Sequence, residues 1–443
     1  MKYCASRYNF EVQEKDGSLL FYNSSTGGFL VVDDPTIRKE TMEVLSEGID
    51  GEIPERLKLL EEGKFLVPSE TDEREEIFQK FTDAVNNEKQ FELCVLPVED
   101  CNFRCRYCYE HFRKLRMTPQ VEEKVKKLFY YKTKSVEKVI IAWYGGEPLL
   151  GIDCIARLSD AFGDIIREQG LTSDVHITTN GFLLSTENAN KLICLGIKRF
   201  HITIDGLPEI HDSLRVLKNG KGTFHRVVNN LLELRKTKHQ FQVIVRSNFD
   251  RNTQKSLPNF LQWFNDNFGE DERFSIYFTG IYPTGTEKDR EFDFCSWAEV
   301  ARVNLRLREF GLKKGVTNLY QKVPSPVAAF CFAPARNAII IGADGILWKC
   351  VETLDLDDAV GDLSKHGEEK YNPRYYEWIN QSYRDDNVCW NCPFLPVCQG
   401  GCPLARKAGK KSCRYSQKNI KRLLRLSYQE HLKKRMIQTK NAV

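Results

Sequence analysis

The sequence predicts an α/β protein with a parallel sheet at its centre, a small module before the sheet and a cysteine-rich region after it. Apolar, strand-like runs alternate with amphipathic helical stretches through the middle of the 443-residue chain. Such alternation is typical of a parallel sheet, either open or rolled into a barrel. Eleven of the 15 cysteines fall either at 101–108 or after position 294. We therefore expect three parts: residues 1–85, 86–310 and 311–443.

Composition and charge exclude several classes of protein. Hydrophobic residues make up 41% and aromatic residues 11%, a globular balance. The net charge of +4 is small for this length and argues against a dedicated nucleic-acid binder. No apolar run of about 18 residues predicts a membrane helix, and the first residues lack the apolar core of a signal peptide. We expect a cytoplasmic protein, in which reduced cysteines favour metal or catalytic roles over disulfides.

The first part, residues 1–85, is predicted to be a small α+β module. Two strand-like runs at 18–23 and 28–32 enclose a turn signal. Helical patterns follow at about 35–47 and 54–63, then an extended end at 64–68. A polar helix over 70–90 links the module to the next part.

The second part, residues 86–310, carries the alternation. Its expected strands lie at 91–97, 138–143, 174–179, 199–204, 242–246 and 274–278. Its expected helices include 119–132, 154–169, 185–196 and 223–237. In parallel sheets of this kind, chemistry lies at the carboxyl ends of the strands.

Three cysteines follow the first of these strands directly: Cys101, Cys105 and Cys108. Thiolates are soft ligands that suit iron–sulfur clusters, and three of them leave the fourth iron of a cubane without a protein ligand. The alternatives are a structural zinc site, which requires four ligands, or unrelated core cysteines.

The spacing CxxxCxΦC, with Tyr107 as the aromatic Φ, resembles the radical S-adenosylmethionine superfamily. The resemblance covers roughly residues 91–310 and implies a partial (β/α)6 barrel, a [4Fe–4S] cluster on the three cysteines, and cleavage of S-adenosylmethionine to a 5′-deoxyadenosyl radical. It also implies that Tyr107 and residues at the strand ends bind S-adenosylmethionine, the latter being Gly145, Gly146, Glu147, Asn180, Thr203, Asp205 and Arg215. Taken singly, each of these turns can also be an ordinary glycine-containing loop.

The third part, residues 311–443, resembles the SPASM domain over about 325–415, where it matches the seven-cysteine pattern of that domain in full. The resemblance implies two auxiliary [4Fe–4S] clusters, making three in all. The distal cluster takes Cys389, Cys392, Cys398 and Cys413, and the proximal cluster takes Cys331, Cys350 and Cys402. No cysteine stands just upstream of Cys331. The proximal cluster then has an open iron, a non-cysteine or water ligand, or Cys295 as its fourth ligand. The chain closes with a basic helix over 417–436.

The module at 1–85 resembles the winged-helix-like peptide recognition element of peptide-modifying pathways; the alternative is an extension of the barrel. With the other resemblances it implies a maturase that binds the leader of a ribosomally made, Cys-containing precursor peptide. An electron donor such as flavodoxin or ferredoxin is a further expected partner; nucleic acid and membrane are not. Asp205, His211 and Asp212 lie near the expected pocket rim, and none can be named as a base.

Thioether formation between a Cys sulfur and a carbon is the expected reaction of this maturase. Formylglycine formation in a sulfatase and carbon–carbon cross-linking remain as alternatives within the same superfamily. Two readings from other classes also remain, a zinc-binding peptide-capture module and an electron-transfer protein.

Overall fold

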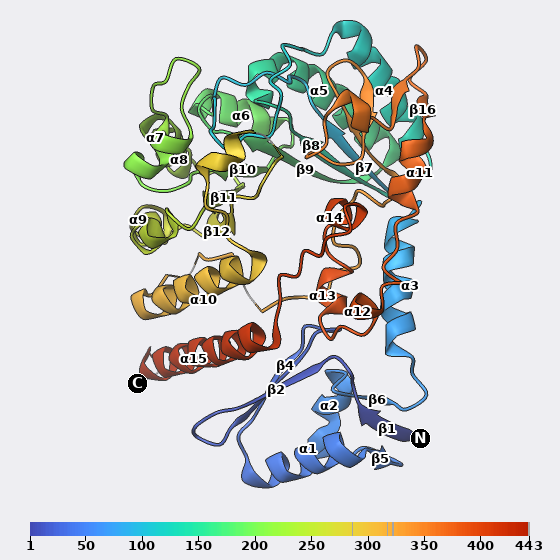
Figure 1. Ribbon diagram of the computed structural model, residues 1–443, viewed down its shortest axis with the longest axis vertical. Coiled ribbons are helices and arrows are strands. Elements are labelled where there is room, and N and C mark those ends of the chain that lie inside the picture. The colour runs from blue at the N-terminus through green and yellow to red at the C-terminus, as the bar shows by residue number, and fades with distance from the viewer. Residues whose placement is uncertain (286, 317, 321–322, 442–443) are drawn as a thin grey trace.

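Six parallel strands form the centre of the computed structural model, which describes every residue except 286, 317, 321–322 and 442–443. They stand in space in their order along the chain (Figure 1), as β7 (Gln90–Val95), β8 (Lys138–Trp143), β9 (Thr172–Thr179), β10 (Arg199–Thr203), β11 (Gln242–Phe249) and β12 (Phe274–Gly280). This confirms the predicted α/β fold with a parallel core. Strand β11 runs three residues further than expected and so includes Asn248.

Helices pack on one side of this sheet, and their apolar faces build the main core. They are α4 (Pro119–Thr133), α5 (Ile152–Gln169), α6 (Thr186–Cys194), α7 (Pro208–Leu214), α8 (Phe224–Arg235), α9 (Leu257–Phe268) and α10 (Trp297–Lys314). Phe129 of α4 stacks on Phe162 of α5 with ring centroids 4.2 Å apart, and Trp143 of β8 stacks on the same ring. Strand residues that point outward pack against the helices, and the alternate residues point to the inner face of the sheet, where the site lies.

The sheet continues past the boundary predicted at 310/311. Strand β13 (Ala338–Ile341) pairs in parallel with β7, and β14 (Ile346–Trp348), β15 (Gly361–Leu363) and β16 (Glu369–Tyr371) follow in antiparallel order. The isoleucines at 339–341 are buried, and their strand covers an edge of β7 that would otherwise present unpaired backbone groups. Short helices complete this region, namely α11 (Pro373–Ile379), α12 (Asn387–Trp390), α13 (Leu395–Cys398) and α14 (Pro403–Lys407).

The N-terminal region contains two small antiparallel sheets. One has the order β5 (Ile49–Asp50), β1 (Lys2–Ala5), β6 (Leu66–Pro68), and the other β2 (Asn9–Gln13), β3 (Leu19–Asn23), β4 (Phe29–Val32). Its helices are α1 (Pro35–Glu47), α2 (Lys58–Glu62) and the linking α3 (Glu73–Val85). The sequence did not indicate β1, β2 or β5.

The last helix, α15 (Gln417–Asn441), packs against this N-terminal region (Figure 1). Its buried residues Ile420, Leu424 and Tyr428 share one core cluster with Phe10 and Leu20 of the β2–β3 hairpin. The apolar face of the basic tail is therefore used within the chain itself. Among the described residues, no helix is long and apolar enough to cross a membrane.

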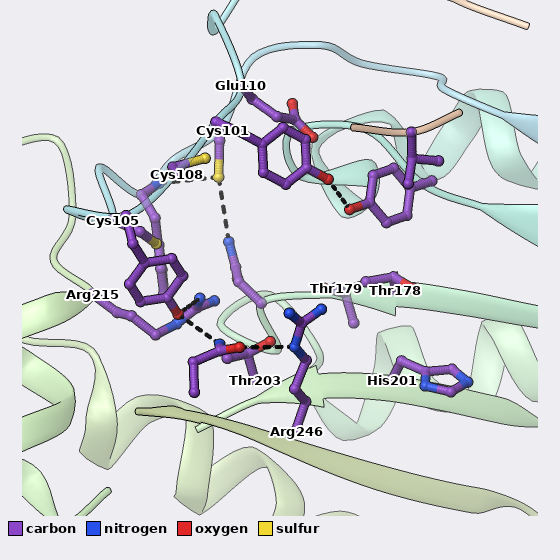
Figure 2. Close-up of a pocket in the computed structure, with 18 of the residues that line it drawn as sticks. Cys101, Cys105, Cys108, Glu110, Thr178, Thr179, His201, Thr203, Arg215 and Arg246 are labelled. Atoms are coloured by element: carbon purple, nitrogen blue, oxygen red, sulfur yellow. Dashed lines mark hydrogen bonds between the residues drawn. The ribbon is translucent and has the colours of Figure 1, made fainter. Parts of the chain in front are cut away.

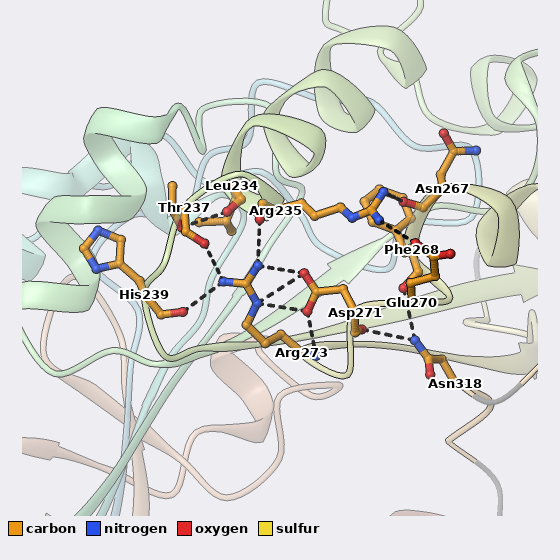
Figure 3. Close-up of polar contacts among 10 residues, drawn as sticks. All are labelled: Leu234, Arg235, Thr237, His239, Asn267, Phe268, Glu270, Asp271, Arg273 and Asn318. Carbon is orange, nitrogen blue, oxygen red and sulfur yellow. Dashed lines mark hydrogen bonds and ion pairs between the residues drawn. The ribbon is translucent and has the colours of Figure 1, made fainter. Parts of the chain in front are cut away.

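Arg273 precedes the start of β12, at the end of the sheet opposite the carboxyl ends of the strands. Figure 3 shows its contacts. Its guanidinium donates to the carbonyls of Arg235, Thr237 and His239 at 2.6–3.0 Å, and to both carboxylate oxygens of Asp271. One side chain thereby ties the end of α8 and the loop after it to the start of β12.

Candidate active site

A cavity of about 290 Å³ opens at the carboxyl ends of the parallel strands (Figure 2). Cys101, Cys105 and Cys108 all line it, together with residues that follow the neighbouring strands. Val351 and Glu352, directly after Cys350, complete its wall. The rule that chemistry lies at the carboxyl ends of parallel strands holds here, because segments far apart in sequence meet at one edge.

Backbone hydrogen bonds hold the cysteine loop in place. Arg104 N–H donates to the carbonyl of Val216 at 2.7 Å, and Arg106 N–H to that of Leu214 at 2.9 Å. Burial raises the pKa of all three thiols, that of Cys108 to about 12. Thiols at this depth stay protonated alone and become thiolates when they bind metal, so loading releases protons.

The arrangement of the three thiols fits a cluster better than a single ion. Within the described residues, no three Cys, His, Asp or Glu side chains converge closely enough to share one metal ion. In a cubane cluster each cysteine binds its own iron, so the sulfurs need only face a common volume. Cys101, Cys105 and Cys108 do so at the wall of this cavity (Figure 2).

Gly145 and Gly146 bring the end of β8 against the cysteine loop. A Cβ on Gly145, whose φ is 114°, would lie 2.3 Å from the carbonyl oxygen of Val98. A Cβ on Gly146 would lie 2.5 Å from that of Asp100. Both glycines also line the cavity. Their lack of a side chain therefore lets the backbone approach the loop on one side and a ligand on the other.

Glu147 lies beneath the cavity and does not line it. It is fully buried, and its two oxygens accept from Thr179 Oγ1 at 2.6 Å, Asn180 N–H at 2.7 Å and Leu149 N–H at 3.0 Å. Burial raises its pKa, while these hydrogen bonds lower it. The sequence suggested this carboxylate as an acceptor for an ammonium group, whereas the structure uses it to join β8 to β9.

Tyr107 joins Asp205, Arg215 and Asn248 in one network. Its hydroxyl donates to Asp205 and accepts from Arg215 Nη1 at 2.8 Å and from Asn248 Nδ2 at 3.1 Å. Asp205 is fully buried below the cavity, where burial raises its pKa. Asp205 and His211 are both fully buried, so neither is on the rim where the sequence placed it.

Arg215 has an unused donor. It lines the cavity and is 7% exposed, and its Nε has no hydrogen-bond partner among the described residues. A buried N–H without a partner is costly, and a carboxylate would satisfy it. Asn180 and Thr203 line the same cavity, and Asn180 Nδ2 lies 3.7 Å from Cys101 Sγ. These residues fit a ligand that carries a carboxylate next to the cysteines, as S-adenosylmethionine does.

Sequence reasoning missed several residues of the cavity wall: Glu110, Tyr144, His201, Arg246, Asn248, Tyr277 and Tyr282. Burial raises the pKa of Glu110 to about 8. One signal was present in the sequence, because Arg246 interrupts the apolar run of β11 with a charge.

The seven C-terminal cysteines form two groups in space. Cys331, Cys350 and Cys402 lie close enough for charge on one thiol to affect the next, and so do Cys389, Cys392, Cys398 and Cys413. Cys295 is elsewhere, among Asp250, Arg251, Asp293 and Glu299. The stretch just upstream of Cys331 includes residues 321–322, which lie outside the described residues.

Comparisons with known proteins agree with this site. Residues 95–247 match the family model described as the radical SAM superfamily. The chain is 24% identical over 347 residues to a cysteine-type anaerobic sulfatase-maturating enzyme of Clostridium novyi, covering 71% of this chain and 88% of that protein. An AdoMet-dependent heme synthase of Methanosarcina barkeri is 32% identical, over only 38% of its length.

Two solved structures share the fold. The structure of anSMEcpe with bound AdoMet and a Cp18Cys peptide aligns with a TM-score of 0.56 and 17% identity, covering 80% of this chain and 99% of that one. Streptococcus suis SuiB bound to its precursor peptide SuiA aligns with a TM-score of 0.53 and 15% identity, covering 94% and 99%. The chain is a radical S-adenosylmethionine enzyme, and this implies a [4Fe–4S] cluster and S-adenosylmethionine at the cavity.

Proposed function

We propose that this enzyme modifies a ribosomally made peptide by linking a cysteine sulfur to a carbon of another residue. One observation carries the proposal. The group Cys331, Cys350 and Cys402 has three cysteines, and the two residues after Cys350 line the same cavity as Cys101 and its neighbours. A substrate thiolate bound at a fourth, open iron would lie at the wall of the cavity in which the carbon is attacked.

The chain's own residues position the reactants. When bound, the first cluster and S-adenosylmethionine supply a 5′-deoxyadenosyl radical that takes a hydrogen atom from the peptide. Arg215 and Asn180 orient the cosubstrate, and the enclosed strand ends exclude water. The product is lighter than its precursor by two hydrogens: one leaves as that atom and one as the thiol proton. Cys331, Cys350 and Cys402 would hold an auxiliary cluster, which would accept the remaining electron and pass it to a carrier such as flavodoxin or ferredoxin.

The N-terminal module is proposed to hold the leader of the precursor peptide. Strand β4 is an edge of its sheet, with no partner on its outer side among the described residues. An extended peptide adds to such an edge through backbone hydrogen bonds. The solved structures of SuiB and anSMEcpe with bound peptides support a peptide as the substrate.

A second candidate function is oxidation of a sulfatase side chain to formylglycine. The similarity to the sulfatase-maturating enzyme over 88% of that protein favours it. Carbon–carbon cross-linking is a third outcome of the same radical chemistry. Both differ from thioether formation because neither forms a new bond between a substrate sulfur and a carbon of another residue.

The test is an anaerobic reaction of the reconstituted protein with dithionite, S-adenosylmethionine and a Cys-containing peptide encoded beside its gene. We expect about 12 irons per chain, 5′-deoxyadenosine, and a peptide lighter by two hydrogens that resists thiol alkylation. Cys350→Ala should still form 5′-deoxyadenosine but no cross-link, whereas Cys154→Ala, in the core, should do both. A product with all its thiols alkylatable would refute thioether formation. No 5′-deoxyadenosine from protein with an intact first cluster would refute the radical chemistry.

A further inference from the structure

Arg246 places a positive charge on the inner face of the parallel sheet. Along β11, Ile244, Arg246 and Asn248 alternate with Val245 and Ser247, so their side chains share the inner face of the sheet. Figure 2 shows the guanidinium directed into the cavity that the three cysteines line. The residue is half-buried, and the cavity itself supplies its accessible surface.

Among the described residues, no carboxylate pairs with this charge. Arg246 Nε donates to the amide oxygen of Asn248 at 2.8 Å. The ionisable groups that act most strongly on Arg246 are Tyr277, Tyr282, Tyr144 and Tyr107, all phenols. Within the described part of the chain, Arg246 takes part in no ion pair, whereas Arg273, at the other end of the sheet, has Asp271. A half-buried cation loses part of its hydration, and an anion or strong acceptors offset that loss.

None of the described carboxylates near the cavity pairs with Arg246. Glu110 lies across the cavity from it (Figure 2), and the other two accept hydrogen bonds from other groups. Asp205 accepts from Tyr107 and from the backbone and side chain of Asn248. Glu352 accepts from the Tyr282 hydroxyl at 2.5 Å. The missing anion must therefore come from a molecule that enters the cavity.

The cavity contains two arginines, and S-adenosylmethionine has one carboxylate. Arg215 lies beside Cys105 and has the unpartnered Nε, so it is the better placed for the cosubstrate. A chain of hydrogen bonds through Tyr107 and Asn248 separates Arg246 from Arg215, and Arg246 lies on the side where Tyr277 and Tyr282 form the wall. This leaves Arg246 for a second anion.

We propose that Arg246 anchors a carboxylate of the peptide substrate, either an Asp or Glu side chain or the C-terminus, beside the residue that is attacked. This inference rests on the proposed peptide-modifying function and adds a substrate class to it. Planar guanidinium binds carboxylate through paired, charged hydrogen bonds, which would fix the orientation of the bound segment as well as its affinity. Peptides without a carboxylate at that place would bind weakly.

The test compares blocked seven-residue Ala/Gly peptides that contain one cysteine and either Glu or Gln, with a third that has Gln and a free C-terminus. Binding to the reconstituted, S-adenosylmethionine-loaded enzyme is measured by equilibrium dialysis without reductant, so no turnover is needed. We expect the Glu or the free-C-terminus peptide to bind at least about tenfold more tightly than the blocked Gln peptide. The difference between those two arms identifies the source of the carboxylate.

Variants then show whether Arg246 causes the preference for peptides with a carboxylate. Arg246→Gln should abolish this preference and keep the affinity for S-adenosylmethionine within about twofold. Arg246→Lys should keep part of it, and Arg199→Gln, on the next strand at the opposite end, should keep all of it. Equal binding of all peptides to the native enzyme would overturn the proposal. So would an Arg246→Gln enzyme that loses S-adenosylmethionine but retains the peptide preference. Formation of 5′-deoxyadenosine without peptide reports separately on the radical chemistry.

Discussion

Glu147 and Thr179 are joined by a 2.6 Å hydrogen bond that links the turn after β8 to the end of β9 beside the active-site cavity. Thr179 is the last residue of β9, and Glu147 follows the two glycines that contact the cysteine loop. The pair therefore holds the loop that carries Cys101 in a fixed position relative to β9.

Glu147→Gln should destabilise the protein and loosen this connection. The amide keeps one acceptor and turns its NH2 toward groups that themselves donate, so the free energy of unfolding should fall by about 1–3 kcal/mol. Urea unfolding measures the loss, and iron content shows whether the first cluster still loads. Glu123→Gln, on the exposed face of α4, is the control. Equal stability of the two variants would show that Glu147 is not a structural link.

Gly145→Ala should disturb the cysteine loop more than the backbone conformation alone explains. The new Cβ would lie 2.3 Å from the Val98 oxygen. Gly196 has a φ of 86° with no atom within 4 Å of its Cβ position. Gly196→Ala should therefore carry only the strain of a left-handed conformation, about 1–2 kcal/mol. We expect Gly145→Ala to lose more stability than this and also to bind less iron. Matching losses in both variants would contradict the contact with the loop.

Arg273→Lys should lower the free energy of unfolding by about 1–3 kcal/mol. A lysine cannot reach three carbonyls and both oxygens of Asp271 at once (Figure 3). Because the network lies opposite the cavity, S-adenosylmethionine binding should be unchanged at temperatures where the variant is folded. Arg302→Lys, at an exposed arginine of α10, is the matched substitution. A stable Arg273→Lys protein would mean that the carbonyls find other donors.

His176 should make the protein less stable as the pH falls below about 6.5. Burial, with a smaller contribution from Arg199, lowers its pKa to about 4, while Asp174 opposes the shift. Between these values the unfolded chain binds a proton that the folded chain does not, so unfolding becomes easier by about 2 kcal/mol between pH 7 and pH 5. His176→Gln should remove this contribution to the pH dependence. The contribution of His201, whose ring centroid is 5.8 Å away and whose pKa is also lowered by burial, should remain. Unfolding curves at both pH values check it; an unchanged pH dependence in the variant would refute it.

Leu424→Ala should release α15 from the N-terminal sheets. Leu424 is completely buried, and truncation of such a leucine costs about 2–5 kcal/mol. Limited proteolysis should then cut within 417–441 earlier than in the native protein. Leu432→Ala changes a leucine that is 37% exposed and should not alter the cleavage rate. If both variants resist the protease equally, α15 is held by its ion pairs rather than by this apolar face.

Local patterns in the sequence were sufficient for the elements that depend on neighbouring residues. The six parallel strands follow from short apolar runs. The cysteine loop comes directly after the first of these runs, which locates it at the end of β7. Strand β13 was missed because its partner is β7, more than 200 residues earlier, and no local pattern specifies such a pairing. Strand β1 was missed for the same reason, because its partners β5 and β6 are distant in the sequence, and β5 was missed with it.

Side-chain roles at the site were harder to predict than positions. Glu147 stands in the segment that the sequence indicated, yet its carboxylate is turned away from the cavity to bind backbone N–H groups. The sequence marks Arg246 only as a charge within an apolar run, because its place on the inner face depends on the register of β11 between β10 and β12. Residue type and spacing do not contain that register.

The pairing of β13 with β7 has a consequence for how the chain can be divided. A shortened chain that ends at 310 would leave β7 with one bare edge, and bare edges of parallel sheets invite pairing with other chains. Such a fragment would tend to aggregate even though it contains every residue of the cysteine loop. The region that carries Cys331 and Cys350 is thus part of the central sheet and not a separate domain. It cannot be exchanged between relatives without β13, the strand that pairs it with β7.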